Sequence, residues 1–359
     1  MKPLIFTCLA FFAAATVFGQ EKTYTIHGIV TDAKTGAPLP GASVFCQNTT
    51  TGTISDSIGR FSLRMANGGY DLVVSYTGYQ TQVQRVSNSS KDKDSLQIAL
   101  AEEDKAMSEV VVTGGSLADG WEKYGNFFLQ HFIGTSENAS QCTLVNKEAL
   151  LFYFSKKSNR LKVRAKDQLE IINNALGYKI HYQLDSFVNY YNTHISSYTG
   201  YPLFEELSGT PEQVEQWKKN RYLTYLGSRL HFMRSWYDST LKDEGFEIEA
   251  VLDSGGAENT RELENPYDSS FYSVDSGIVD IDIHGRFRIT YTNRVPDKAY
   301  LIQNRFPVNT KAQISAADIQ DGFSIEENGY FFEQSTFTNM GYWAWKKLAE
   351  VLPYDYNPE

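Results

Sequence analysis

The chain has 359 residues, of which 42% are hydrophobic and 14% aromatic, and its 43 acidic and 33 basic residues give a formal net charge of -10. Because single domains commonly run about 100–200 residues, this length predicts two domains. The acidic balance excludes nucleic acid as a main partner, since binding to phosphate backbones requires a basic face.

The first segment has the pattern of an export signal. Lys2 precedes an apolar run from Leu4 to Phe18, and small residues favour cleavage before Gln20. This run is shorter than the roughly 20 residues that span a bilayer. We therefore predict a signal peptide over residues 1–19 and an exported chain, periplasmic or outer-membrane-associated, without a membrane-spanning segment. Lipidation at Cys8 is the less favoured alternative, because the apolar run continues past it.

Residues 20–100 alternate short apolar-polar runs with turns rich in Gly, Pro, Asn and Asp, which is typical of an all-β sandwich. In RFSLRM, for example, Phe61, Leu63 and Met65 share one strand face. The predicted strands are TYTIHGIVTD, PLPGASVFC, TTGTISD, RFSLRM, YDLVVSYTGYQTQVQRV and the run from Leu96 to Leu100.

The stretches GIVTDAKTGAPLPGASV, TGTISDSIGRFSL and YDLVVSYTGYQTQ resemble the carboxypeptidase-like regulatory domain, a transthyretin-like or Ig-like β-sandwich. This domain stands at the N-terminus of many TonB-dependent outer-membrane receptors. The resemblance implies the sandwich fold and a cell-envelope location. It implies no catalysis, because the sandwich of that family carries no catalytic residues.

Residues 101–119 read as a linker that contains the β-branched segment EVVVTG. In the receptors a similar segment precedes a plug and a barrel, whereas the remaining residues here lack the regular alternating strands of a barrel. Two interpretations stay open for Glu109 to Thr113. The segment is a strand docked on a neighbouring sheet, or a strand offered to outer-membrane transport machinery.

Residues 120–359 predict an α+β domain of unknown function with an antiparallel sheet and one long buried helix. The first predicted element is a helix, from the helical spacing of aromatic residues in WEKYGNFFLQHFIG. A hairpin around residues 157–159 and a strand in GYKIHYQLDSFVNYY are predicted next. The long helix is expected from Thr210, which begins a capping sequence, to about Lys242. A hairpin turning at His284 and Gly285, a strand FFEQSTFT and a terminal helix GYWAWKKLAEVLP follow. This region resembles an uncharacterised extension paired with the same regulatory domain, which implies no activity.

The sequence contains no recognisable catalytic motif. A metallocarboxypeptidase would require His-x-x-Glu with a distant second His, and none of the six histidines has Glu three residues on. The Gly-x-Ser-x-Gly elbow and the Gly-rich phosphate loop are also missing from the sequence. We therefore predict no metal and no cofactor, and we favour a non-enzymatic protein while leaving open a hydrolase that uses no recognisable motif.

The densest polar cluster of the later region is KKNRYLTYLGSRLHFMRS. Two interpretations are open for Arg221, Ser228 and His231 in this cluster. They form an anion site or a Ser/His pair, or, as we favour, they are polar groups of a packed helix. Tyr190, Tyr191, Tyr198 and Tyr201 form a second group, either a stacking surface for a sugar or peptide or simply half-buried aromatics.

Two smaller features complete the sequence-based expectations. Asp280 and Asp282 are two positions apart and therefore lie on one face of the predicted strand. They could bind a cation there, and ordinary solvent exposure of that face accounts for them equally well. Cys46 and Cys142 are expected to be buried free thiols in preference to a disulfide.

The leading hypothesis is a non-enzymatic envelope binding or adaptor protein that recognises a protein, peptide or glycan partner. A hydrolase with an unrecognised site after Gly120 is the alternative. The second alternative is an adaptor that offers the EVVV segment to a partner.

Overall fold

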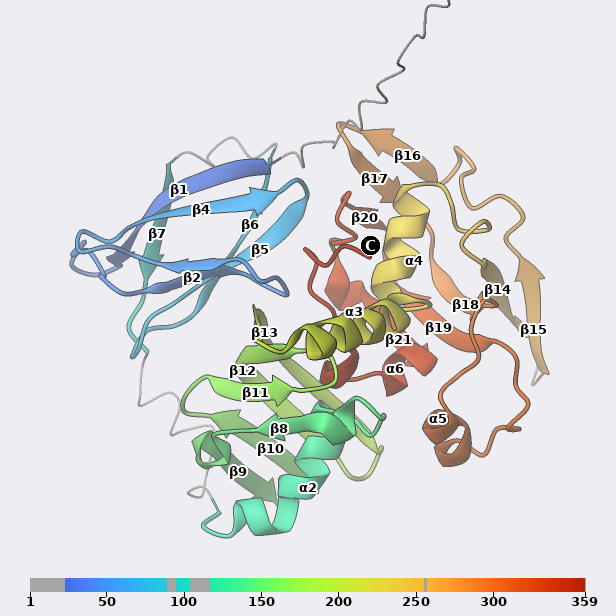
Figure 1. The fold of residues 1–359 in the computed structure, drawn as a ribbon, viewed down its shortest axis with the longest axis horizontal. Helices are drawn as coiled ribbons and strands as arrows, with labels where there is room; N and C mark the ends of the chain where they lie inside the picture. The colour runs from blue at the N-terminus through green and yellow to red at the C-terminus, as the bar shows by residue number, and fades with distance from the viewer. Residues whose placement is uncertain (1–22, 89–94, 104–116, 255–256, 359) are drawn as a thin grey trace, which may run out of the picture.

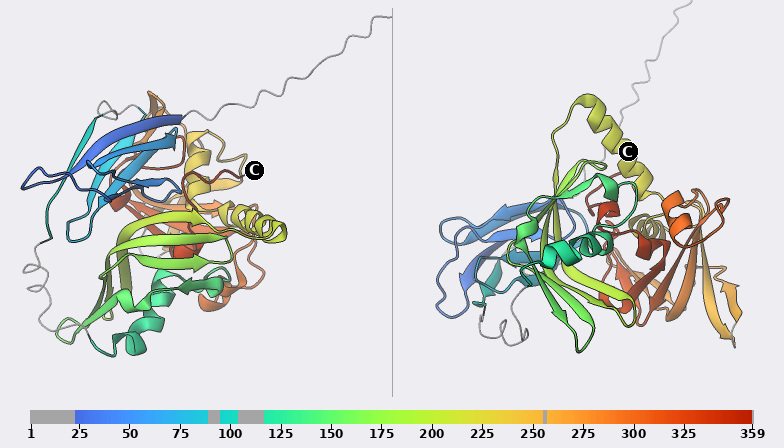
Figure 2. Two further views of the ribbon diagram at one scale, coloured as in Figure 1. Left: turned by 60° about the vertical axis from the view of Figure 1, so that its left-hand side comes forward. Right: turned by 90° about the horizontal axis from the view of Figure 1, so that it is seen from below.

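The structure, a computed structural model, describes residues 23–88, 95–103, 117–254 and 257–358. The expected signal peptide and the EVVVTG segment lie outside the described residues. The chain is mostly β-sheet with few helices, and its sheets gather in three lobes (Figures 1 and 2).

The first lobe is the predicted β-sandwich. One sheet has the strand order β4-β1-β7 and the other β3-β2-β5-β6, and β1 runs parallel to β7 while the remaining pairs are antiparallel. In β4 and β7 alternate residues face the core between the sheets, as the sequence pattern indicates. The strands are β1 (Thr23–Asp32), β2 (Ser43–Cys46), β3 (Gly52–Ile54), β4 (Arg60–Ala66), β5 (Gly69–Ser75), β6 (Gln82–Ser87) and β7 (Leu96–Leu100).

The second lobe packs helix α2 (Gly120–Phe132) against a six-stranded antiparallel sheet. Long strand β12 (Tyr178–Tyr190) pairs with β11 and β10 along one edge and with β13 along the other. The predicted helix, the hairpin and the strand of this region are confirmed. The other strands are β8 (Cys142–Leu144), β9 (Leu150–Ser155), β10 (Arg160–Ala165), β11 (Leu169–Asn173) and β13 (Ile195–Glu206).

The third lobe combines a five-stranded sheet, β15-β14-β18-β19-β21, with a three-stranded sheet, β16-β17-β20. Helix α4 (Arg229–Tyr237) packs on both sheets and shares their apolar core. The strands are β14 (Phe246–Ser254), β15 (Ala257–Glu262), β16 (Tyr272–Asp275), β17 (Ile278–Ile281), β18 (Gly285–Tyr291), β19 (Gln313–Ile319), β20 (Phe323–Ile325) and β21 (Phe337–Gly341); short helices α5 (Lys298–Gln303) and α6 (Tyr342–Trp345) flank them.

The prediction of one long buried helix is wrong. The capping box at Thr210 is present, but α3 (Pro211–Tyr225) ends before Gly227, whose φ of 75° no helix accommodates. Ser228 then starts α4 (Arg229–Tyr237), because its side chain accepts the backbone N–H of His231 at 3.1 Å. Much of α3 is exposed, whereas α4 is largely buried.

Three further expectations for the C-terminal part are also wrong. Strands β17 and β18 do not form a hairpin, since they belong to different sheets. The segment FFEQSTFT becomes a strand only from Phe337, after Glu333 adopts a left-handed φ of 62°. The terminal helix stops at Trp345, because its side chains enter separate cores: Trp343 joins the third lobe and Leu348 the second.

The sandwich is docked against the rest of the chain. Tyr330, Phe332 and Tyr354 belong to the same apolar cluster as the sandwich strands. Near Asn48 the backbone also pairs with β13, where Phe204 N–H donates to Thr49 O at 2.8 Å. Residues from the last 30 positions therefore complete the core that the first 100 begin.

Cys46 and Cys142, the cysteines in the described residues, are free, as expected. Cys46 is fully buried, its thiol lies 2.8 Å from Met65 Sδ, and burial raises the pKa of that thiol well above its usual value. Cys142 is half-buried on the second lobe, with its thiol 3.5 Å from Asn138 O. They do not form a disulfide.

Candidate functional site

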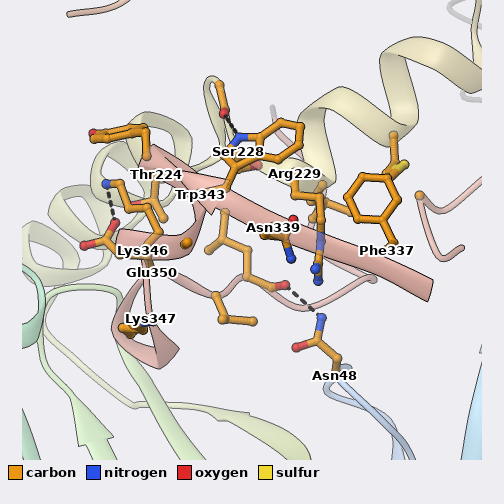
Figure 3. A pocket seen from close by; sticks show the side chains of 18 of the residues that line it. Asn48, Thr224, Ser228, Arg229, Phe337, Asn339, Trp343, Lys346, Lys347 and Glu350 are labelled. Atoms are coloured by element: carbon orange, nitrogen blue, oxygen red, sulfur yellow. Dashed lines mark hydrogen bonds and ion pairs between the residues drawn. The ribbon is translucent and has the colours of Figure 1, made fainter. Parts of the chain in front are cut away.

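A cavity of about 630 Å³ opens where the three lobes meet; we name it the junction cavity. Its walls come from the sandwich loop at Asn48, from the start of β13, from the turn between α3 and α4, and from the C-terminal segment after Gly329. Figure 3 shows Lys346, Lys347 and Glu350 on one side of it and Phe337 on the other. A space of this size accommodates a small ligand or a short segment of a polymer.

Asn48 joins three of these walls. Its backbone N–H donates to Pro202 O at 2.7 Å, its carbonyl accepts from Tyr354 N–H at 2.7 Å, and its side-chain Nδ2 donates to Leu352 O at 3.2 Å. The residue adopts a left-handed φ of 56°, which Asn tolerates better than most residues do. This turn therefore fixes the C-terminal segment between the sandwich and β13.

Two cations of the junction cavity have no hydrogen bond or ion pair among the described residues. Arg229, the first residue of α4, extends toward Asn48 with Asn339 beside it (Figure 3). Its side chain is half-buried, and its guanidinium carbon lies 5.2 Å from the Phe331 ring centre. Lys347, also half-buried, has its pKa lowered by burial. A buried positive charge without a counter-ion is costly, so both groups favour an anion.

Lys346 differs from these two cations because its ammonium is paired. It lies 2.7 Å from Asp297 Oδ2 and 2.9 Å from Glu350 Oε2. Burial lowers the pKa of Lys346, but the two carboxylates more than offset this effect and the pKa is raised. Arg294, which also lines the cavity, lies 4.0 Å from Asp297 Oδ1. Among the described residues, the cations of the cavity without a carboxylate partner are therefore Arg229 and Lys347.

Three residues that line the junction cavity each have a buried side-chain oxygen without a hydrogen-bond partner in the described part of the chain. These oxygens are Asn48 Oδ1, Gln313 Oε1 and Asn339 Oδ1. Gln313 is only 3% exposed, and its amide nitrogen lies 3.4 Å from Val295 O. An unsatisfied buried acceptor costs about 1–3 kcal/mol. These residues therefore combine a place in the cavity wall with an oxygen that has no partner in the described part of the chain.

The structure separates the residues of the polar cluster. Arg221 donates to Leu176 O at 2.7 Å, to Gly177 O at 3.1 Å and to Glu206 Oε1 at 2.8 Å, so its fork holds the second lobe to α3. Arg221 lines a second cavity of about 550 Å³, whereas Ser228 lines the junction cavity.

His231 is 3% exposed and lines neither cavity. Gly227 N–H donates to its Nδ1 at 3.1 Å, so the ring proton resides on Nε2, 3.1 Å from Glu244 Oε2. Burial lowers the pKa of His231, while Glu244 opposes the shift. Because Ser228 Oγ accepts the backbone N–H and not a ring nitrogen, no Ser/His pair is formed.

The tyrosines also divide. Tyr190 is 41% exposed, Tyr191 packs on Phe127 with ring centres 5.5 Å apart, and Tyr201 is half-buried. Tyr198 alone of the four lines the junction cavity, and burial raises its pKa to about 12 while Arg229 opposes this rise.

Tyr198 and Tyr201 lie three apart on β13 and therefore face opposite sides of the sheet. The four tyrosines do not form one surface.

The paired aspartates have protein partners. Asp280 Oδ1 accepts from Ser324 Oγ, and Asp282 Oδ1 lies 3.0 Å from His284 Nε2. No group of three or more His, Cys, Asp or Glu side chains in the described ranges is arranged to hold a metal ion. Nor is any described helix long and apolar enough to cross a membrane.

Sequence reasoning missed the residues that give the junction cavity its polarity, namely Asn48, Arg229, Gln313, Asn339 and Lys347. The dipeptide Gly227-Ser228 was a usable signal, because Gly ends helices and Ser begins them. It places Arg229 at the start of a new helix. Nothing local indicates that Asn48 or Gln313 reaches the same space.

Residues 26–112 match the CarboxypepD_reg-like domain family, so the chain carries this domain at its N-terminus. Two curated relatives match over this part of the chain. The TonB-dependent receptor SusC of Bacteroides thetaiotaomicron is 36% identical over 113 residues, which are 32% of this chain and 10% of that protein. The TonB-dependent receptor P39 of Formosa agariphila is 32% identical over 111 residues, 31% of this chain and 10% of that protein. The chain thus spans about a tenth of the length of these relatives.

Similarities to solved structures are weaker. A 3-chlorocatechol 1,2-dioxygenase from Rhodococcus opacus is 12% identical, with a TM-score of 0.20, and covers 23% of this chain and 61% of its own. A putative membrane-associated protein of unknown function from Bacteroides fragilis is 12% identical, with a TM-score of 0.18, and covers 89% of this chain and 93% of its own. At these TM-scores neither similarity carries an argument.

Proposed function

We propose that this chain is a non-enzymatic binding protein of the cell envelope, and that its junction cavity takes an anionic segment of a peptide or glycan. One observation carries the proposal: Arg229 lines the cavity with a half-buried guanidinium that has no hydrogen bond or ion pair among the described residues. Lys347 adds to the same cavity a second cation that has no partner in the part of the chain that the structure describes.

The charge and the acceptors together restrict the ligand. Guanidinium groups bind carboxylates through two parallel hydrogen bonds. The unpartnered oxygens of Asn48, Gln313 and Asn339 require donors. A carboxylate with neighbouring O–H or N–H groups meets both demands, and both a uronic-acid unit of a glycan and an acidic residue of a peptide have this arrangement.

The envelope location rests on the N-terminal domain. That domain is of the CarboxypepD_reg-like family, and the two curated relatives that share it are TonB-dependent receptors. The export signal expected over residues 1–19 agrees with this location. Because only the sandwich is shared, the relatives support the compartment and not the ligand.

Calorimetry with defined probes tests the ligand class. Oligogalacturonate is compared with a neutral glucose oligomer, and an acidic hexapeptide with its amide counterpart. We expect one acidic probe to bind and its neutral counterpart not to. Arg229→Ala should weaken binding at least tenfold, since a hydrogen bond to a charged group is worth about 1.5–3 kcal/mol. Arg286→Ala, on an exposed part of β18, is the matched control.

A second variant separates a binding site from a packing defect. Asn339 Oδ1 has no partner in the described residues, so Asn339→Leu removes an unsatisfied acceptor from the free protein. We expect unchanged or higher stability of the free protein together with weaker binding of the acidic probe. If neither acidic probe binds, or if Arg229→Ala and Arg286→Ala bind equally well, the proposal is wrong.

A further inference from the structure

The segment around α5 concentrates exposed apolar side chains. Among the described residues, five of the fourteen large hydrophobic side chains that are exposed lie within positions 295–314. The three most closely spaced are Ile302 at 70% exposure, Phe306 at 48% and Val308 at 80%. We name these three side chains the α5 tips.

The α5 tips stand on a rigid support. Tyr300 and Leu301 are buried, and the Tyr300 ring lies 4.9 Å from that of Tyr342 and 5.5 Å from that of Trp345. Phe306 N–H donates to Leu301 O at 2.9 Å, which closes the turn after α5. The backbone is therefore held, the Phe306 ring packs 5.5 Å from the Tyr300 ring while staying half-exposed, and the side chains of Ile302 and Val308 are exposed. Figure 1 shows α5 protruding from the third lobe.

The same segment is positively charged in an acidic protein. Lys298, Arg305 and Lys311 are exposed and form no ion pair with any described residue, and no Asp or Glu lies between Lys298 and Lys311. The preceding acid, Asp297, accepts from Tyr342 OH at 2.9 Å and from Lys346 Nζ at 2.7 Å, so its charge is already neutralised. The chain as a whole has a net charge of -10.

We infer that the α5 segment docks on an anionic lipid surface. A peripheral membrane site combines apolar side chains that enter the headgroup region with cations that contact anionic lipids. Three protruding side chains are too few for a stable protein interface, which buries about 1,200–2,000 Å². They suit a soft bilayer surface, which adapts to their shape. The exposed cations Lys298, Arg305 and Lys311 supply the attraction to anionic lipids beside these side chains.

Vesicle co-sedimentation tests the inference. The chain from Gln20 onward keeps every described element and removes the apolar run of residues 4–18, which would bind lipid by itself. We expect binding to vesicles of 70% phosphatidylcholine and 30% phosphatidylglycerol at low salt, and little binding to pure phosphatidylcholine. Each basic residue near such a surface contributes about a fivefold change in affinity.

Two triple variants and a matched control decide the outcome. The apolar triple variant replaces Ile302, Phe306 and Val308 by Ser. The basic triple variant replaces Lys298, Arg305 and Lys311 by Ala. Each should lower partitioning into the anionic vesicles at least tenfold. The control triple Ile54→Ser, Ile195→Ser and Val274→Ser changes side chains of similar exposure, 68%, 59% and 62%, and should bind as the wild type does.

Phe306→Trp provides a readout of insertion. Its emission should shift to shorter wavelength when anionic vesicles are added. Equal binding by the apolar triple variant and the wild type would overturn the inference. So would a change in oligomeric mass on light scattering without vesicle binding, because the α5 tips would then form a protein interface.

Discussion

Tyr330 donates a hydrogen bond from its hydroxyl to Asp71 Oδ1 at 2.8 Å, across 259 positions of the sequence. Asp71 lies on β5 of the sandwich, and Tyr330 follows β20 and enters the sandwich core at 5% exposure. Burial raises the pKa of Asp71, while Tyr330 and Arg85 oppose the rise. This contact ties the first lobe to the third.

Tyr330→Phe should therefore destabilise the chain. The substitution leaves the Asp71 carboxylate buried without its hydroxyl donor, and a hydrogen bond to a charged group is worth about 1.5–3 kcal/mol. Urea unfolding measures the loss. Tyr222→Phe, at a 45% exposed position of α3, is the control and should change stability little. Equal unfolding midpoints for the two variants would mean that the hydrogen bond contributes nothing to docking.

The buried carboxyl group of Glu326 should make the stability of the fold depend on pH. It is 5% exposed, and its Oε1 has no hydrogen-bond partner in the described chain. Burial raises its pKa to about 7 from 4.5, Glu327 adds to the rise, and Arg85 opposes it. Between these two pH values the folded state holds a proton that the unfolded state releases, so stability falls as pH rises through this window.

Glu326→Gln should flatten that fall, because the amide does not titrate. One unit of pKa difference corresponds to about 1.4 kcal/mol, so the whole effect is a few kcal/mol at most. Urea midpoints at pH 5, 6 and 7 measure the slope. Burial lowers the pKa of His231, and this gives a slope of opposite sign that both proteins share. Parallel curves for wild type and Glu326→Gln would contradict the prediction.

Gly227 separates α3 from α4 and should not tolerate alanine. Its φ is 75°, and a Cβ there would lie 2.3 Å from Gln313 Oε1 and 2.6 Å from Tyr291 Cδ1. A left-handed conformation alone costs a non-Gly residue about 1–2 kcal/mol. Gly36→Ala isolates this term, since Gly36 has a φ of 71° and no atom within 4 Å of the added Cβ. We expect Gly227→Ala to lose clearly more stability than Gly36→Ala; similar losses would show that the site relaxes.

Arg221 is expected to be a structural residue of the second lobe. It is 8% exposed, lies 3.9 Å from the Tyr178 ring centre and makes three hydrogen bonds. Arg221→Lys should cost about 2 kcal/mol in denaturant unfolding, because an ammonium cannot reproduce the planar fork. Arg286→Lys, at an exposed position, should be neutral. A stable Arg221→Lys protein would favour a binding role for this residue.

The sandwich is the part of the fold that residue order alone predicts. Alternation in TYTIHGIVTD and RFSLRM and the turns between them are properties of adjacent residues, and the structure has these strands where expected. The same holds for α2, for the β9–β10 hairpin and for the capping box at Thr210. Each depends on side chains within a few positions of one another, so local rules suffice.

The C-terminal elements were mispredicted for a physical reason. The segment GYWAWKKLAEVLP has helical residues, yet Trp343 and Leu348 pack in different lobes, and one straight helix cannot serve both. Tertiary packing outweighs helix propensity at such positions, because propensity differences amount to only a few tenths of a kcal/mol per residue.

Sequence reasoning named only Ser228 and Tyr198 among the residues of the junction cavity that carry the argument, and it did not bring them together. Asn48 and Leu352 are hydrogen-bonded across 304 positions, and no local pattern pairs them. Arg229 has no counter-ion among the described residues, whereas Arg221, eight residues earlier, makes three hydrogen bonds. This difference depends on which groups the folded chain places around each guanidinium. Residue order thus specifies the sandwich and the charge of each side chain. Long-range packing decides that, within the described residues, two cations and three side-chain oxygens around the junction cavity stay unpaired, because their surroundings come from distant segments.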